Sequence, residues 1–248
     1  MSAGASDEPA AGSSAGPAAG LVLRDYWRSS ASYRVRIGAA LKGLPLTTVA
    51  VDLRTGAHLS GDLGEVNPQR LLPVLETEEG ALTQSLAILE YLDDLHPQRP
   101  LLDHDPLTRA RQRAMAQVIA CDVHPVCNLR VLKALRAQGC DEAAVRAWMH
   151  QWMHAGFEAL EAYATALGIE ARTESADADG AGDAADADGA APRYLGGTQP
   201  MLPDVVLVPQ MYNARRFELD LAPYPRLVAV TARCEVLPAF ESAAPRDV

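Results

Sequence analysis

The chain has 248 residues, of which 48% are hydrophobic, so it is long enough and apolar enough to build one or two packed cores. Its formal net charge of −10 argues against nucleic acid or an acidic membrane surface as a general partner. Residues 170–191 contribute a net −6 of that charge, so the remainder is close to balanced and compatible with an anionic small substrate.

The four cysteines form no paired framework, and no run of about 18 apolar residues occurs. No basic segment precedes an apolar one at the start of the chain. We therefore expect a cytoplasmic protein with reduced thiols that is neither exported nor inserted into a membrane.

Residues 1–20 are almost entirely Ala, Gly, Ser and Pro, which cannot bury enough apolar surface to fold, and we predict a disordered arm there. A β-α-β unit is expected to follow, because a run of strong helix formers separates two short apolar segments. Its parts are a strand at residues 21–26, a helix that begins at Ser29 and Ser30 and ends at Gly43, and a strand at residues 46–53.

Two adjacent hydroxyls, Ser29 and Ser30, stand where the cap of this first helix belongs. A helix start offers unpaired backbone N–H groups and the positive end of the helix dipole, and both favour an anion. A thiolate is one candidate, because hydroxyl donors beside a helix start lower the pKa of a thiol. An ordinary capped helix with no ligand is the alternative for this stretch alone.

A second helix start of the same kind is predicted at Gln84 and Ser85, after a hairpin that turns at residues 78–80. Just before the hairpin, Leu72 precedes Pro73, and a proline at this place can hold a cis bond and present the backbone of the residue before it to a ligand.

The rest of the chain is predicted to be helical from Asp105 and Pro106, a good cap and first-turn pair, so we set a domain boundary near residue 104. Residues 170–191 are acidic and of low complexity, and we predict a disordered loop insertion there.

Several motifs together resemble the zeta class of glutathione transferases. Residues 29–37, SSASYRVRI, resemble its signature, with Ala31 where the family often has cysteine. Residues 123–132 and 203–225 resemble its later landmarks. The family commonly starts the helix of the second segment with Ser or Thr three residues before an Asp, but here Met201 stands three residues before Asp204, and a missing cap costs about 1 kcal/mol, enough to loosen the start of the helix. The resemblance extends over most of the chain. It implies an α/β thioredoxin-like domain at residues 21–103, an all-α domain at residues 104–248, and a homodimer.

The resemblance also implies a glutathione cofactor and a set of site residues. Ser29 and Ser30 are expected to activate the thiol, and Arg28 and Arg216 to bind a small anionic dicarboxylate-like substrate. The residues expected to hold glutathione are Ser29, Ser30, Ala31, Ser32, Tyr33, Arg34, His58, Leu72, Gln84, Ser85, His124, Asn128, Leu129 and Arg130. No metal is expected: Cys121, His124 and Cys127 lack the fourth ligand of a structural zinc site.

The activity implied is glutathione-dependent cis–trans isomerisation of maleylacetoacetate to fumarylacetoacetate, a step of tyrosine and phenylalanine catabolism. Reversible addition of the thiolate would turn the conjugated double bond into a rotatable single bond. Isomerisation of maleylpyruvate in the gentisate pathway and general glutathione transfer are the related alternatives. A non-catalytic interaction module with the same fold is the alternative from another class.

Overall fold

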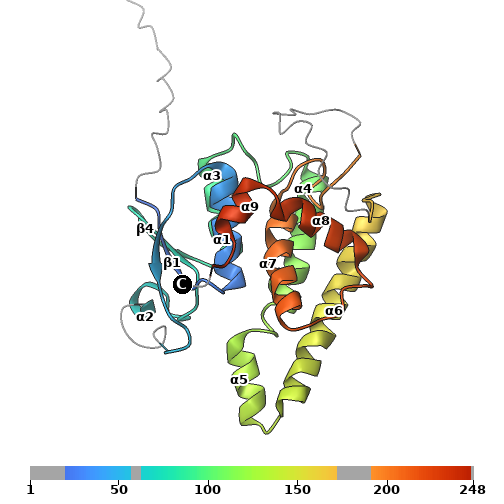
Figure 1. Ribbon diagram of the computed structural model, residues 1–248. Helices are drawn as coiled ribbons and strands as arrows, with labels where there is room; N and C mark the ends of the chain where they lie inside the picture. Colours follow the sequence, from blue (N-terminus) through green and yellow to red (C-terminus); the bar gives the residue numbers. More distant parts are fainter. Residues whose placement is uncertain (1–19, 57–62, 172–190, 247–248) are drawn as a thin grey trace, which may run out of the picture.

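A computed structural model describes residues 20–56, 63–171 and 191–246 (Figure 1). Residues 1–19 of the predicted arm, residues 172–190 of the predicted insertion, and His58 lie outside the described residues. Among the helices described, none combines the length and the apolar character that crossing a membrane requires.

The first part of the chain is a mixed four-stranded sheet with helices against it, as the resemblance implies. The strand order is β2-β1-β3-β4, in which β1 runs parallel to β2 and antiparallel to β3, while β3 and β4 form the predicted hairpin. The elements are β1 (Val22–Asp25), α1 (Ser30–Lys42), β2 (Thr47–Ala50), α2 (Leu63–Val66), β3 (Val74–Thr77), β4 (Gly80–Thr83) and α3 (Ser85–Leu95).

The regular elements of the second part are helices within the described residues, and one isolated β-bridge joins Tyr194 to Gly197 in the loop before α7. Asp105 caps its first helix by accepting a hydrogen bond of 2.8 Å from the Thr108 backbone N–H, which confirms the predicted start. The elements are α4 (Pro106–Gln117), the π-helical turn η2 (Val118–Val123), α5 (Leu129–Ala137), α6 (Glu142–Ala166), α7 (Leu202–Arg216), α8 (Pro225–Glu235) and α9 (Pro238–Ala243).

Helix α1 lies between two cores, with α9 beside it and α7 beyond (Figure 1). Val35 and Ala39 pack against the sheet and α3, whereas Tyr33 and Ile37 join the core of the helical part. Residues two apart on an α-helix point about 200° apart, so Val35 and Ile37 face opposite sides. Burial on both sides explains why Tyr33, Val35 and Ile37 alternate with arginines in the pattern typical of a half-buried strand, although the segment is helical.

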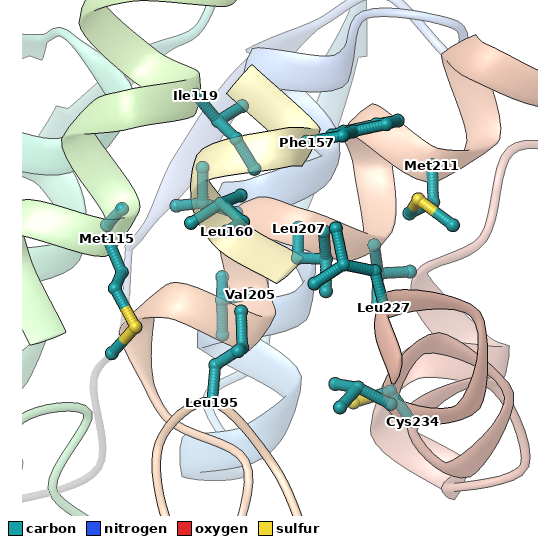
Figure 2. Packing of buried hydrophobic residues seen from close by; sticks show 14 of the residues in the cluster. Met115, Ile119, Phe157, Leu160, Leu195, Val205, Leu207, Met211, Leu227 and Cys234 are labelled. Carbon is teal, nitrogen blue, oxygen red and sulfur yellow. The ribbon is translucent and has the colours of Figure 1, made fainter. Parts of the chain in front are cut away.

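The larger core fills the space between the helices of the second part (Figure 2). Side chains from α4, η2, α6, α7 and α8 converge there, and Phe157, Leu207 and Leu227 are completely buried in it. Cys234 belongs to the same core, and burial raises the pKa of its thiol well above the ordinary value. This cysteine is therefore a packing residue.

The start of α7 corrects the prediction made from Met201. Met201 gives no side-chain cap, but the buried carboxylate of Asp204, three residues into the helix, accepts backbone N–H bonds from Met201, Leu195 and Gly196 at 2.8–3.0 Å. The chain thus supplies its own anion to this helix start, which is not loosened. Burial raises the pKa of Asp204 to about 6, against the opposing effect of these hydrogen bonds.

Candidate functional site

A cleft of about 400 Å³ lies where the start of α1 meets the helical part of the chain. Five segments of the chain line it, at residues 26–30, 53–54, 70–72, 124–133 and 210–217, and they include nine of the residues predicted for the site. Those nine are Arg28, Ser29, Ser30, Leu72, His124, Asn128, Leu129, Arg130 and Arg216. Leu72 precedes Pro73 through a cis peptide bond, as the resemblance implies.

The Ser29 hydroxyl caps α1 and keeps its proton available. Its oxygen accepts a hydrogen bond of 3.2 Å from the Ser32 backbone N–H, so the cap predicted from sequence is confirmed. The first turn of α1 contains no acidic residue. The O–H of Ser29 and the dipole of α1 are therefore both free to act on an anion in the cleft.

Ser30, by contrast, is committed to the helical part of the chain. Its oxygen accepts a hydrogen bond of 3.0 Å from Asn213 Nδ2 on α7, and it lies 3.3 Å from Nδ1 of His124 after η2. Burial, followed by the positive charges of Arg34 and Arg130, holds the pKa of His124 well below its ordinary value, so its ring is neutral. In the tautomer of His124 that has no proton on Nδ1, Ser30 donates its own proton to that nitrogen, and Ser29 is then the hydroxyl that can donate to a ligand.

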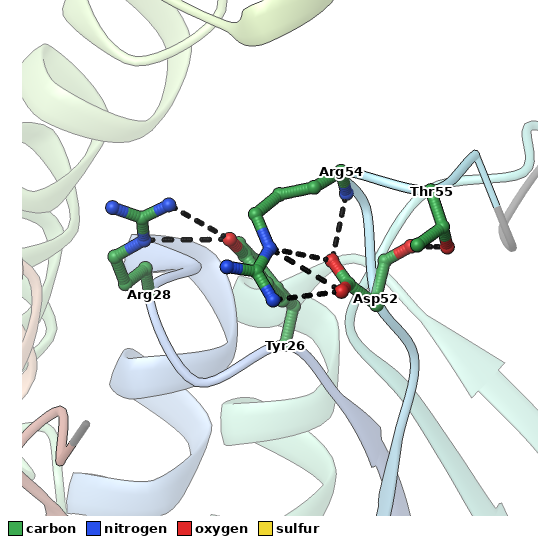
Figure 3. A network of polar contacts seen from close by, with 5 residues as sticks. All are labelled: Tyr26, Arg28, Asp52, Arg54 and Thr55. Carbon is green, nitrogen blue, oxygen red and sulfur yellow. Dashed lines mark hydrogen bonds and ion pairs between the residues drawn. The ribbon is translucent and has the colours of Figure 1, made fainter. Parts of the chain in front are cut away.

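The lining is strongly cationic although the protein as a whole is acidic. Among the described residues it contains no Asp or Glu, and its basic side chains are Arg28, Arg54, Arg70, Arg130, Lys133 and Arg216. Asp52 neutralises Arg54 through an ion pair of 2.9 Å (Figure 3). No ion pair joins Arg28 or Arg216 to a carboxylate within the described part of the chain, so both charges can serve an anionic ligand.

Neighbouring aromatic groups hold these two arginines in place. The Tyr26 hydroxyl accepts from Nε and Nη2 of Arg28 at 3.3 and 3.1 Å (Figure 3). The Arg28 guanidinium carbon lies 4.8 Å from the centre of the Trp27 ring. Arg216 lies over Phe217 at 4.7 Å. Burial and then the charge of Arg28 lower the pKa of Arg216, as expected for like charges that share one cleft.

The start of α3 lies outside the lining of the cleft, although Gln84 and Ser85 are predicted site residues. Gln84 has a φ of 69°, which is uncommon for a residue with a side chain and costs of order 1–3 kcal/mol. Ser85 opens the helix, is buried, and accepts a hydrogen bond of 3.2 Å from Nη1 of Arg34. No acidic residue stands in the first turn.

Four predicted residues of the signature, Ala31, Ser32, Tyr33 and Arg34, are buried in α1 and do not line the cleft. Tyr33, for example, packs edge-to-face on the Tyr212 ring, and burial raises its pKa to about 12. These four side chains therefore do not reach a ligand in the cleft as the structure stands.

Sequence reasoning missed Tyr26, Asn213 and Lys133 in the lining. Asn213 is part of the NARRF motif and so carried a signal, but Tyr26 showed none, because its role depends on the position of Arg28. Within the described residues, no group of three or more His, Cys, Asp and Glu could hold a metal.

Known proteins resemble the chain over nearly its whole length. Residues 28–95 match the family model described as glutathione S-transferase, N-terminal domain. Maleylpyruvate isomerase from a Ralstonia species is 42% identical over 91% of this chain and 97% of the relative. Maleylacetoacetate isomerase from Rhizobium meliloti is also 42% identical, over 90% of this chain and 95% of the relative.

Solved structures agree with these relatives. A holo maleylpyruvate isomerase, described as a bacterial zeta-class glutathione S-transferase, superposes with a TM-score of 0.78 at 41% identity and covers 90% of this chain and 96% of its own. Maleylacetoacetate isomerase from Anaeromyxobacter dehalogenans has a TM-score of 0.72 at 40% identity and covers 91% of each chain. That structure holds dicarboxyethyl glutathione and citrate in its active site.

Proposed function

Because the chain belongs to the zeta class of glutathione transferases, we propose that it is a glutathione-dependent cis–trans isomerase that converts maleylacetoacetate to fumarylacetoacetate. The observation that carries the proposal is the composition of the cleft. A hydroxyl with a free proton at a helix start faces a lining that has cationic side chains and, within the described residues, no carboxylate.

Ser29 would make the thiol of glutathione reactive. A free thiol with a pKa of about 8.5 is only a few per cent ionised at neutral pH, and lowering its pKa by one to two units would ionise most of it. The Ser29 O–H and the positive end of α1 both stabilise a thiolate over a thiol. Ser30 contributes by fixing the start of α1 against α7 through Asn213.

The thiolate would then add to the conjugated carbon–carbon double bond of the substrate. A C–S bond forms while the π electrons move to the conjugated carbonyl oxygen as an enolate, and the former double bond is free to rotate. Collapse of the enolate re-forms the double bond in the trans geometry and expels the thiolate, so no atoms are gained or lost. Arg28 and Arg216 would hold the substrate carboxylate and stabilise the enolate charge.

The remaining predicted residues would hold the rest of glutathione. The Leu72 backbone would pair with the cysteinyl unit, and Gln84 and Ser85 would bind the γ-glutamyl end. Arg130, with His124, Asn128 and Leu129, would close the cleft from the helical side. Citrate bound together with a glutathione adduct in the active site of the Anaeromyxobacter relative supports a cleft that holds glutathione and a carboxylate ligand at once.

Isomerisation of maleylpyruvate is the second candidate, because a maleylpyruvate isomerase and a maleylacetoacetate isomerase are equally similar to this chain. Both substrates present a maleyl group with a carboxylate, so the cationic cleft serves either.

We also infer that the protein is a homodimer, from the family resemblance, and that it is cytoplasmic, because its cysteines are not paired in disulfides. Light scattering at micromolar concentration should give twice the monomer mass of 26.5 kDa.

The deciding experiment compares the rates of isomerisation of maleylacetoacetate and maleylpyruvate by the purified protein, with and without glutathione. We expect glutathione-dependent turnover, fastest for maleylacetoacetate. Faster turnover of maleylpyruvate would select the second candidate. Conjugation of glutathione to electrophiles without isomerisation would indicate a general transferase, and failure to bind immobilised glutathione would indicate a non-catalytic module.

A further inference from the structure

Arg34 is a buried cation with most of its hydrogen-bonding capacity unused. Its side chain on α1 is 2% exposed, and its one protein partner among the described residues is the Ser85 hydroxyl, 3.2 Å from Nη1. Nε and Nη2 have no hydrogen-bond partner among the residues that the structure describes. Within residues 20–56, 63–171 and 191–246, no carboxylate forms an ion pair with it.

This arginine remains charged in the folded protein. Burial lowers its pKa to about 10, which still leaves it protonated at neutral pH. An unpaired buried charge is costly, and buried charges in proteins are normally matched by a partner of opposite sign. The ligand-free protein therefore contains an uncompensated positive charge that an anion nearby would neutralise.

The Arg34 guanidinium points at the start of α3. Ser85 is the first residue of that helix, and the backbone N–H groups of the first turn have no partner within the helix. The first turn has no acidic side chain, and Gln84 before it adopts the uncommon φ of 69°. The start of α3, the Ser85 hydroxyl and the buried Arg34 cation therefore meet at one place, where the described part of the chain supplies no anion.

The hydrogen bond from Arg34 also sets the direction of the Ser85 hydroxyl. Because the oxygen accepts from Nη1, the O–H proton has to point away from Arg34. A carboxylate at the helix start would receive that proton as well as backbone N–H groups, and would lie close to the guanidinium charge without touching it.

We propose that Arg34 is a positioning residue that prepares the start of α3 for the α-carboxylate of the γ-glutamyl group of glutathione. It orients the Ser85 hydroxyl so that the hydroxyl donates to the carboxylate. It also places a buried positive charge next to Ser85, and the bound carboxylate compensates that charge. This rests on the proposed use of glutathione and adds a residue that acts through Ser85 and not by contact with the ligand.

A purely structural role would have a different signature. If Arg34 served only to join α1 to α3, its removal would destabilise the protein and weaken every ligand alike. If it prepares an anion site, replacing it with an apolar side chain removes an unfavourable buried charge from the free protein and weakens only ligands that carry the carboxylate. The two roles predict opposite changes in ligand-free stability.

The test measures, by calorimetry, binding of glutathione and of an analogue in which the γ-glutamyl α-carboxylate is a carboxamide. For Arg34→Met we expect glutathione to bind about tenfold to a hundredfold more weakly, since a hydrogen bond to a charged group contributes about 1.5–3 kcal/mol. The analogue should bind the variant and the original protein equally, and the ligand-free melting temperature should stay level or rise. Arg34→Lys, which keeps the charge, should retain most of the preference for glutathione.

Equal weakening of both ligands, or a ligand-free melting temperature that falls in Arg34→Met, would overturn the proposal. If Arg34→Met fails to fold, Arg34→Gln, which removes the charge, is combined with Ser85→Ala in a double-mutant cycle: additive losses of glutathione affinity would rule out coupling through Ser85. Should the original protein not bind glutathione at all, the proposed function fails. Normal binding by both the original protein and Arg34→Met would refute the role of Arg34 alone.

Discussion

The start of α7 and the starts of α1 and α3 use the same physical device in opposite ways. At α7 the chain fills the positive helix end with its own carboxylate, Asp204, which is completely buried and accepts three backbone N–H bonds. At α1 and α3 the first turn holds no acidic residue, and hydroxyls stand at the start instead.

This difference separates a structural helix start from one that is available to a ligand. The third position of α7 is Asp204, whereas the third positions of α1 and α3 are Ser32 and Ala87. An acid at that position neutralises the helix end from within, and its absence leaves the end to a thiolate or a carboxylate from outside. Substitutions that remove the acid from the start of α7, or add one at the start of α3, test this difference.

The largest effect is expected from removing the Asp204 carboxylate from the start of α7. Asp204→Ala strands the N–H groups of Leu195, Gly196 and Met201 in the interior, and each stranded group costs about 1–3 kcal/mol, so the free energy of unfolding should fall by about 3 kcal/mol or more. Urea unfolding measures it. The matched control is Asp105→Ala, which removes an exposed cap at α4 and should cost only about 1 kcal/mol. Equal losses in the two variants would show that burial of the cap is unimportant.

Removing the Ser29 hydroxyl from the start of α1 should lower the turnover rate more than it lowers the free energy of unfolding. Ser29→Ala should lower the rate about tenfold to a hundredfold, because a hydrogen bond to a thiolate contributes about 1.5–3 kcal/mol. The remaining activity should recover as pH rises and solvent ionises the thiol. Ser29→Gly, which preserves most of the capping, should lose as much activity as Ser29→Ala. A variant with full turnover at neutral pH would refute the activation step.

The charge state beside α1 provides a third test, in which the signal is the dependence of stability on pH. The pKa of His124 lies below its unfolded value of about 6.5, so below that pH the unfolded chain binds a proton that the folded protein does not. Stability should therefore fall as pH drops from 7 to 5, and His124→Asn should lose roughly 1–2 kcal/mol less over this range. A slope in His124→Asn equal to that of the original protein would contradict this account.

The smallest effect is expected from placing an acidic side chain in the first turn of α3. Ala87→Asp places an exposed carboxylate at the position equivalent to Asp204, where it competes for the helix end. A surface charge at a helix end contributes about 0.3–1 kcal/mol, so glutathione should bind about twofold to fivefold more weakly. Ala87→Asn, of the same shape but neutral, should bind normally. If the two variants bind glutathione equally well, the electrostatic part of the comparison is wrong.

Local features of the fold were predictable from the sequence because they depend on residues near one another in the chain. The caps at Ser29 and Asp105, the end of α1 at Gly43 and the turn at residues 78–80 all follow from local backbone preferences. The cap of α7 was missed because its carboxylate follows the helix start and reaches back to the backbone of Leu195 and Gly196.

The site was predictable only in part, because its geometry depends on contacts between distant segments. The serines at the start of α1 followed from residue type, and the arginines from motifs of the family. The bond from Asn213 to Ser30 and the support of Arg28 by Tyr26 require the folded arrangement. Resemblance alone also could not show that Arg34 is buried behind Ser85 and absent from the cleft.

Burial of α1 on both sides limits how this protein can exchange parts with its relatives. A crossover near residue 104 would separate α1 from α7 and α9, the helices its second side contacts. A transplanted first half would bring side chains at positions 33 and 37 that had been selected against another protein's helices, while positions 35 and 39 still fitted their own sheet. Recombination at this boundary is therefore restricted to parents whose α1, α7 and α9 have changed together.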